Sequence, residues 1–310
     1  MDGESLLYKL RQLLSESSGS SWLDDRTTYD YLYEGAKGFV ARTDCLTASQ
    51  TITTVAEQSA YTLNADFLHL YLTNDSNQFY LKYYDGSGYT FITFREYDGI
   101  YYANQTTSKS IPDHFAIGDV QNVPAQVTGT CTSAGALSNG EAVLTDSTAA
   151  FTTYVSVGDT IHNTTDSAHG VVIDVTTATA IRTAMFGGTD NDWDGSDAYI
   201  IVPQGRLRLI VDPPSSTSGH SIYVPYVQCP VPVYSSYRQY RIPIRSPEVL
   251  ASFAAWKYKY RDREPNFGDA LYKMYEGEIR LAGEKLRKGF QRKGFRVNFT
   301  KQSSRDRSYR

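Results

Sequence analysis

Apolar residues recur every three or four positions near the start of the chain, at 6–14 and again at 29–40. This spacing places them along one side of an α-helix. A serine-rich segment separates the two stretches, and Asp24 or Asp25 can cap the second. The pattern predicts that two amphipathic helices occupy the segment 1–45.

The hydrophobic period then changes to two, and the residues become β-branched and aromatic. This alternation predicts strands at 51–55, 61–63, 67–72, 79–84 and 89–94. Gly86-Ser87-Gly88 joins the last two runs and is typical of a hairpin turn. Similar runs return at 206–211 and 221–227. We expect all of them to share one antiparallel sheet.

The segment between these runs, 120–203, has a different composition. It is rich in Thr, Ser, Ala, Gly and Asp, and Arg182 is its one Lys or Arg. Short Val-, Ile- and Thr-rich runs alternate with Gly-Asp and Asn-Thr turns. The pattern predicts a small all-β domain inserted into the first sheet.

Two further helices are predicted near the C-terminal end. Ser246-Pro247-Glu248 combines a capping residue, a proline at the first helical position and an acidic first turn, so a helix should run on to Tyr260. A second helix should begin near Phe267 and end at Gly289, after a basic last turn. We expect this pair to pack on the first two helices.

Together the patterns predict an α+β protein. It would consist of a helical bundle from both chain ends plus an antiparallel β-sheet domain, with an inserted small all-β domain and an extended C-terminal arm. The predicted parts are N-terminal helices at 1–45, a β-sheet domain at 46–119 and 204–240, the inserted β domain at 120–203, a C-terminal helical pair at 241–288 and a basic C-terminal arm at 289–310.

Charge is distributed unevenly along these parts. Residues 238–310 hold 19 Lys and Arg against 8 Asp and Glu, while the rest of the chain holds 11 against 26. Such asymmetry favours assembly or nucleic-acid contact over small-molecule catalysis. The 25 tyrosines also suit protein interfaces, because a tyrosine ring can be dry while its hydroxyl stays wet.

The chain carries no nucleophile-elbow, zinc-protease or glycine-rich phosphate-binding motif, so we expect no enzyme and no cofactor. His162 and His169 lie seven residues apart and could share a metal, although solvated histidines are the simpler interpretation. Ser218 lies near His220, but neighbours in a polar turn rarely form a nucleophile and its base.

An acidic run in the inserted segment resembles the opening of a calcium-binding loop. It offers Asp190, Asp192 and Asp194 at alternate positions, but Ile201 stands where a bidentate Glu would be needed. An Asp-rich hairpin turn is the alternative. Trp193 lies within the run, and a tryptophan beside aspartates is also common in carbohydrate sites.

Cysteine spacing and hydropathy indicate the compartment in which the protein is made. Three distant cysteines give neither a disulfide framework nor a zinc site. No apolar run approaches the roughly 18 residues of a membrane span, and the first residues lack a basic leader. We expect a protein made in the cytoplasm that makes no membrane contact.

The basic arm repeats the sequence Arg-Lys-Gly-Phe, and its later apolar residues alternate with polar ones as in a strand. We expect it to dock on another protein by strand addition or in a groove. Nucleic-acid backbone and a solvated tail are the alternatives. The predicted contact residues are Phe290, Arg292, Lys293, Phe295, Arg296, Val297, Phe299 and Lys301.

In this order of parts the chain resembles the head-to-tail adaptor, or connector, proteins of tailed bacteriophages. After two opening helices, residues 61–67 read Tyr-Thr-Leu-Asn-Ala-Asp-Phe, with Asn64 where the family usually has proline. The strands at 206–214 and 222–230 resemble the family's paired strands, and 247–260 resembles its closing helix. The inserted segment separately resembles Asp/Thr/Gly-rich β modules of phage structural proteins, at 144–151, 157–159 and 187–189.

The resemblance implies a structural virion protein of the tail or neck. It would form a homo-oligomeric ring, commonly a dodecamer, that joins the portal protein to a tail protein such as a nozzle, tube or fibre. DNA would pass through its channel without sequence-specific contacts. The alternatives are a tail-tube or tail-fibre-attachment protein, or a carbohydrate-binding β protein.

Overall fold

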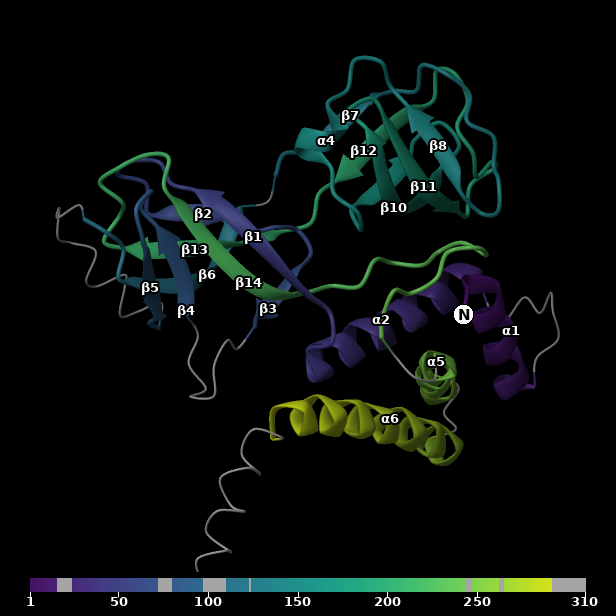
Figure 1. Cartoon of the computed structure of the whole chain (residues 1–310). Helices are drawn as coiled ribbons and strands as arrows, with labels where there is room; N and C mark the ends of the chain where they lie inside the picture. Colours follow the sequence, from purple (N-terminus) through teal and green to yellow (C-terminus); the bar gives the residue numbers. More distant parts are fainter. Residues whose placement is uncertain are drawn as a thin grey trace, which may run out of the picture. The chain divides into compact units, whose positions relative to one another are not determined.

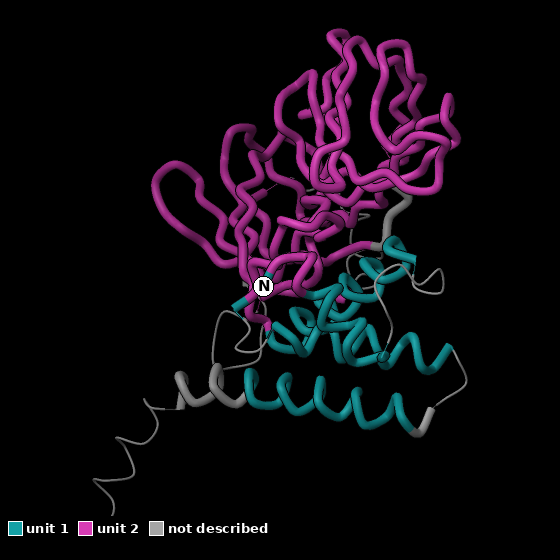
Figure 2. The backbone as a smooth tube through the Cα atoms, turned by 90° about the vertical axis from the view of Figure 1, so that its right-hand side faces the viewer, with its two compact units in different colours: residues 1, 6–43, 243–310 teal, residues 2–5, 44–242 magenta. Residues whose placement is uncertain are grey.

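The computed structural model describes residues 1–15, 24–71, 80–96, 110–122, 124–243, 247–261 and 265–291. The chain divides into two compact units (Figure 2). Unit 1 contains residues 1, 6–43 and 243–310, and unit 2 contains 2–5 and 44–242. The division predicted from the sequence has more parts, and its boundaries stay a prediction.

Unit 1 is built from helices that come from both ends of the chain (Figure 1). The α2 helix packs against both α5 and α6, and α5 packs along α6. The predicted helices are confirmed, with these bounds: α1 (Gly3–Leu14), α2 (Asp25–Thr43), α5 (Glu248–Arg261) and α6 (Pro265–Gln291).

Close approach of α2 and α5 depends on a glycine. A Cβ added at Gly35 would lie 2.8 Å from Cδ1 of Phe253, and the hydroxyl of Tyr275 donates a hydrogen bond to the Gly35 carbonyl at 2.7 Å. The start of α2 is capped by Asp24, whose carboxylate accepts hydrogen bonds from the amide and hydroxyl of Thr27. The predicted helix stop at Gly289 is wrong, because α6 continues to Gln291.

Unit 2 contains two sheets. The first has eight strands in the order β1-β14-β4-β5-β6-β13-β2, with β3 paired to β14. Their bounds are β1 (Thr47–Thr53), β2 (Ala60–Thr62), β3 (Phe67–Leu70), β4 (Tyr80–Tyr84), β5 (Tyr89–Phe94), β6 (His114–Asn122), β13 (Arg206–Asp212) and β14 (Ser221–Gln228). The sheet is not purely antiparallel, since β5 and β6 run parallel with Thr93 opposite His114.

The first sheet curls until its two edge strands meet. On β1, the Gln50 side chain donates a hydrogen bond to the Thr62 carbonyl of β2 at 3.1 Å and accepts one from the Asn64 amide at 3.0 Å. Apolar side chains from every part of the sheet fill the interior. Those that are at most 1% exposed are Leu63, Leu81, Tyr83, Ile92, Phe115, Leu209, Val211, Ile222 and Val224. We call this the first barrel.

The chain leaves the first barrel after β6 and returns in β13, and between them it forms a six-stranded antiparallel sheet, in the order β7-β12-β9-β10-β11-β8. Its elements are β7 (Val127–Thr130), β8 (Ala142–Thr145), the short helix α4 (Phe151–Tyr154), β9 (Thr160–Asn163), β10 (Ala168–Thr177), β11 (Ala180–Phe186) and β12 (Ala198–Val202). The Thr132 amide bonds to the Thr145 carbonyl at 2.7 Å, which links the chain after β7 to the opposite edge strand β8. We call this sheet the second barrel.

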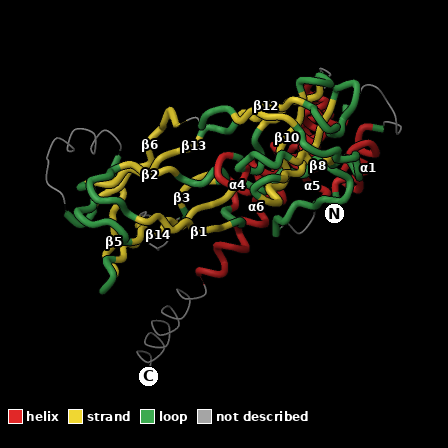
Figure 3. The backbone as a smooth tube through the Cα atoms, turned by 90° about the horizontal axis from the view of Figure 1, so that it is seen from above, coloured by secondary structure: helices red, strands yellow, loops and turns green. Residues whose placement is uncertain are grey.

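The expected fold class, an α+β protein organised by a helical bundle, is wrong. The described part of the chain is mostly β, with fourteen strands in two curled sheets and five helices, and Figure 3 shows strands (yellow) through both sheets. Helices carry strong local signals such as caps and stop glycines, whereas short strands carry weak ones. The predicted helices are all present, so what the sequence pattern understated was the number of strands.

Two further findings concern the cysteines and the helices. The three cysteines, all of which lie in the described residues, carry no disulfide. Within the described segments, no helix is both long enough and apolar enough to span a membrane.

Candidate assembly interface

A group of aromatic side chains lies on the outer surface of the first barrel. Because successive residues of a strand point to opposite sides, Leu81 and Tyr83 of β4 face the core while Lys82 and Tyr84 face outward. The cross-strand partners of these outward residues, Phe91 for Lys82 and Tyr89 for Tyr84, face outward on β5. On the other side of β4, Tyr223 of β14 is also paired with Lys82. We call Lys82, Tyr84, Tyr89, Phe91 and Tyr223 the aromatic face.

The rings of the aromatic face form a contiguous surface. The centroids of Tyr84 and Tyr89 are 4.9 Å apart, and those of Tyr89 and Tyr223 are 6.1 Å apart. Tyr89 is 62% exposed and Phe91 is 61% exposed. The proximity of the Tyr223 hydroxyl raises the pKa of Tyr89. Large exposed rings at adjacent positions are typical of protein interfaces.

The hairpin turn fixes the end of this surface. The Asp85 carboxylate accepts hydrogen bonds from the amides of Ser87 and Gly88, each at 2.8 Å, and these bonds lower the pKa of Asp85. Gly86 has φ +94°, a conformation that suits glycine. The Tyr84 hydroxyl donates to the Gly86 carbonyl at 2.9 Å. The hairpin predicted from Gly86-Ser87-Gly88 is confirmed.

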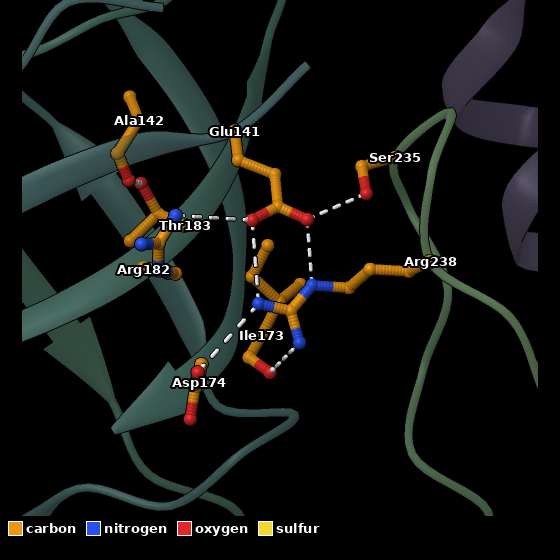
Figure 4. A network of polar contacts seen from close by, with 8 residues as sticks. All are labelled: Glu141, Ala142, Ile173, Asp174, Arg182, Thr183, Ser235 and Arg238. Atoms are coloured by element: carbon orange, nitrogen blue, oxygen red, sulfur yellow. Dashed lines mark hydrogen bonds and ion pairs between the residues drawn. The ribbon is translucent and has the colours of Figure 1, made fainter. Parts of the chain in front are cut away.

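A cluster of polar side chains joins the second barrel to the segment after β14 (Figure 4). Glu141 accepts hydrogen bonds at 2.6 Å from Nε of Arg238 and from the Ser235 hydroxyl. Arg182 lies 3.7 Å from the same carboxylate, and Arg238 lies 3.6 Å from Asp174. We call these five residues the Glu141 cluster.

Electrostatics in the Glu141 cluster oppose desolvation. Burial by itself raises the pKa of Glu141, but the hydrogen bonds from Arg238 and Ser235 and the two arginine charges outweigh it, so the pKa is lowered overall. The lowered pKa keeps Glu141 ionised at neutral pH, although its side chain is only 12% exposed to water. Every member is paired, which indicates that the cluster holds the segment in place.

The carboxylates of the acidic loop in the second barrel accept hydrogen bonds from nearby groups of the protein itself. The Asp190 carboxylate accepts from the Asn191 amide, and Asp197 accepts from the Asp194 amide and from Asn163. Burial and the neighbouring carboxylates raise the pKa of Asp192. Within the described segments, no group of three or more His, Cys, Asp or Glu is placed to hold a metal ion. Calcium binding stays a prediction without support from this geometry.

Trp193 is not on the surface. Its side chain is fully buried, its indole nitrogen donates to the Thr183 hydroxyl at 2.8 Å, and its ring meets Tyr199 edge-on at 6.4 Å. The carbohydrate hypothesis required an exposed ring on which a sugar could stack. A buried tryptophan with a satisfied donor is a core residue, so Trp193 offers no exposed ring to a sugar, and carbohydrate binding stays a prediction without this residue.

The histidines singled out in the sequence fall into two places. His162 and His169 are cross-strand partners on β9 and β10, so the fold brings this pair together, but they supply only two ligands. His220 contacts the hydroxyl of Tyr83 at 2.6 Å, and the Ser218 hydroxyl accepts from the Ala56 amide at 2.8 Å. Ser218 and His220 thus make structural hydrogen bonds at one end of the first barrel.

The predicted C-terminal contact residues are not placed. The backbone at Phe290 belongs to α6, and Arg292, Lys293, Phe295, Arg296, Val297, Phe299 and Lys301 lie outside the described residues. The aromatic face was missed by sequence analysis. Alternation in the 79–84 and 89–94 runs could have indicated it, because both of their faces are aromatic.

Comparison with models of known protein families finds no match for this chain, and comparison with curated protein sequences finds no match either. The functional argument therefore rests on the chain's own residues.

Proposed function

We propose that this protein is a structural component of a tailed-bacteriophage virion, the head-to-tail adaptor ring that joins the portal to the tail and lines the DNA channel. The proposal starts from the sequence resemblance described above. The aromatic face is the structural observation that supports it, because it is a docking surface rather than a reaction site.

The chemistry of the aromatic face suits docking onto another protein subunit. Tyr and Phe rings bury a large apolar area with few rotatable bonds, so they lose little entropy on binding. Lys82 lies between Tyr223 and Phe91 and adds one positive charge to the rings. The occupant that fits is an apolar surface with an acidic side chain at its centre.

The charge distribution supports passage of DNA. Outside residues 238–310 the chain holds 26 Asp and Glu against 11 Lys and Arg. A channel wall with an excess of negative charge repels phosphate, so DNA would move through it without being held.

The test combines microscopy with a binding assay. Negative-stain images of the purified protein should show rings, and mass photometry should show a complex with purified portal protein. A double variant, Tyr89→Ser with Phe91→Ser, should weaken the interface that the aromatic face makes by about tenfold or more, because two exposed anchors are removed.

The matched control is Tyr154→Ser, which removes a ring that is 55% exposed on the second barrel. It should leave assembly unchanged. A protein that stays monomeric and ignores the portal would contradict the proposal. Affinity for tail-tube or fibre protein without affinity for the portal would favour the tail-tube or fibre-attachment alternative.

A further inference from the structure

The α6 helix has two apolar faces, and only one of them packs inside unit 1. Leu271, Tyr275 and Ile279 lie on the inner face and are at most 7% exposed, against α5 and α2. A second set of large apolar residues repeats every seven positions on the outer face. Its members and exposed fractions are Phe267 at 52%, Met274 at 59% and Leu281 at 47%.

Two small residues, Ala270 and Gly277, lie between these large ones. The five residues follow the alternating three-and-four spacing of a coiled-coil seam. A Cβ added at Gly277 would meet no atom within 4 Å, so open space lies beside the helix there. We call Phe267, Ala270, Met274, Gly277 and Leu281 the α6 seam.

The seam lies on the outside of unit 1. Figure 2 shows α6 as the long teal helix at the bottom of this unit, with its other helices on one side. At one end of the seam, the Lys259 ammonium lies 5.7 Å from the centroid of the Phe267 ring. Large residues separated by small ones leave holes into which the side chains of another helix can fit.

The charges that flank the seam identify the occupant. In a seam of this spacing, Lys273 and Arg280 stand at the positions that border it on one side, and Glu278 borders it on the other. A parallel copy of α6 would bring Lys273 opposite Glu278 of that copy, and this is the one bordering pair of which both members lie between Phe267 and Leu281. An antiparallel copy would bring the basic residues of both helices together, which is unfavourable.

We propose that α6 pairs in parallel with α6 of a second copy of this chain through the α6 seam, with ion pairs between Lys273 and Glu278 across the pair. The seam from Phe267 to Leu281 spans roughly 21 Å of helix, enough for two heptads of contact. The inference stands on α6 alone and goes beyond the adaptor proposal, which rests on the aromatic face.

The first test measures self-association of the full chain by sedimentation velocity over a range of concentrations. Met274→Glu should weaken self-association by about tenfold or more, because it places a charge in the centre of the seam. Met274 is exposed in the single chain, so the helical content measured by circular dichroism should not change. The control is Leu137→Glu, a 50% exposed residue of unit 2, which should not affect association.

The second test uses charge exchange. Lys273→Glu and Glu278→Lys should each weaken self-association, because like charges would then face each other. The double variant should restore it, and so should an equimolar mixture of the two single variants. In an antiparallel pair, Lys273→Glu would instead strengthen association, because it would relieve the repulsion between the basic residues of the two helices.

Two outcomes would overturn the inference directly: no effect of Met274→Glu on self-association, or single charge variants that associate as the original chain does. Stronger self-association after truncation behind Gln291 would also overturn it, because residues 292–310 would then be the occupant of the seam. The two proposals fail separately. If rings form and the charge exchange does not affect them, only the adaptor proposal stands. If parallel pairs form but the protein does not bind the portal, only the α6 pairing stands.

Discussion

Single residues in this protein matter most where a charge is held away from water. Glu141 was not singled out from the sequence, because one acid in a Thr- and Gly-rich segment has no local signal. Its arginine partner, Arg238, lies 97 residues away along the chain. Only the tertiary structure brings the two together. By contrast, Asp24 as the cap of α2 was predictable, since its partner Thr27 is three residues away.

Glu141→Gln is expected to lower the free energy of unfolding at pH 7 by about 1–3 kcal/mol, because it removes a charge-assisted hydrogen bond and leaves the Arg238 charge with only the more exposed Asp174 carboxylate nearby. The lowered pKa of Glu141 sets the pH dependence. The ionised carboxylate stabilises the fold above its unfolded pKa of about 4.3, and this contribution disappears as the pH falls through the lower folded pKa.

Urea unfolding of both proteins at pH 7 and at steps below pH 5 measures this effect. The difference between them should shrink as the pH falls. A difference that is constant with pH would show that the loss comes from packing and not from the charge.

At the scale of elements, periodicity predicted where helices and strands form but not how they curl or pair. The 89–94 run was predicted as a strand and is one, but its parallel pairing with β6 was not. Parallel pairing depends on a chain crossing whose course has no local pattern. The glycine stop of α6 failed similarly: glycine weakens a helix by about 1 kcal/mol, which need not end it.

Two glycines of the helices should respond to alanine in opposite ways. Gly35→Ala should destabilise the protein by about 1–3 kcal/mol, because the new methyl group would overlap Phe253. Gly283→Ala on α6 is the matched control, since a Cβ there meets no atom within 4 Å. It should stabilise the protein by up to about 1 kcal/mol through helix propensity. Chemical unfolding followed by circular dichroism measures both, and equal signs would contradict the packing argument.

At the scale of the whole molecule, the two units have separate cores and should unfold as separate transitions. Trp193 lies in unit 2 and Trp256 in unit 1, so each reports one unit. In a Trp22→Phe background, adding Trp256→Phe leaves only the unit 2 signal, and adding Trp193→Phe leaves only that of unit 1. We expect the fluorescence midpoints in urea to differ. Coincident midpoints would mean that the units unfold together.

The sequence by itself determined the local elements: the helices at both ends, the hairpin at Gly86-Ser87-Gly88 and the change of composition in 120–203. These depend on contacts between near neighbours, which hydrophobic period, caps and turn residues encode. Only the tertiary structure decided that the chain is mostly β, that the sheets curl, that Trp193 is buried and that outward rings of three strands form one face. Each of these depends on residues far apart in sequence, whose proximity no local pattern records.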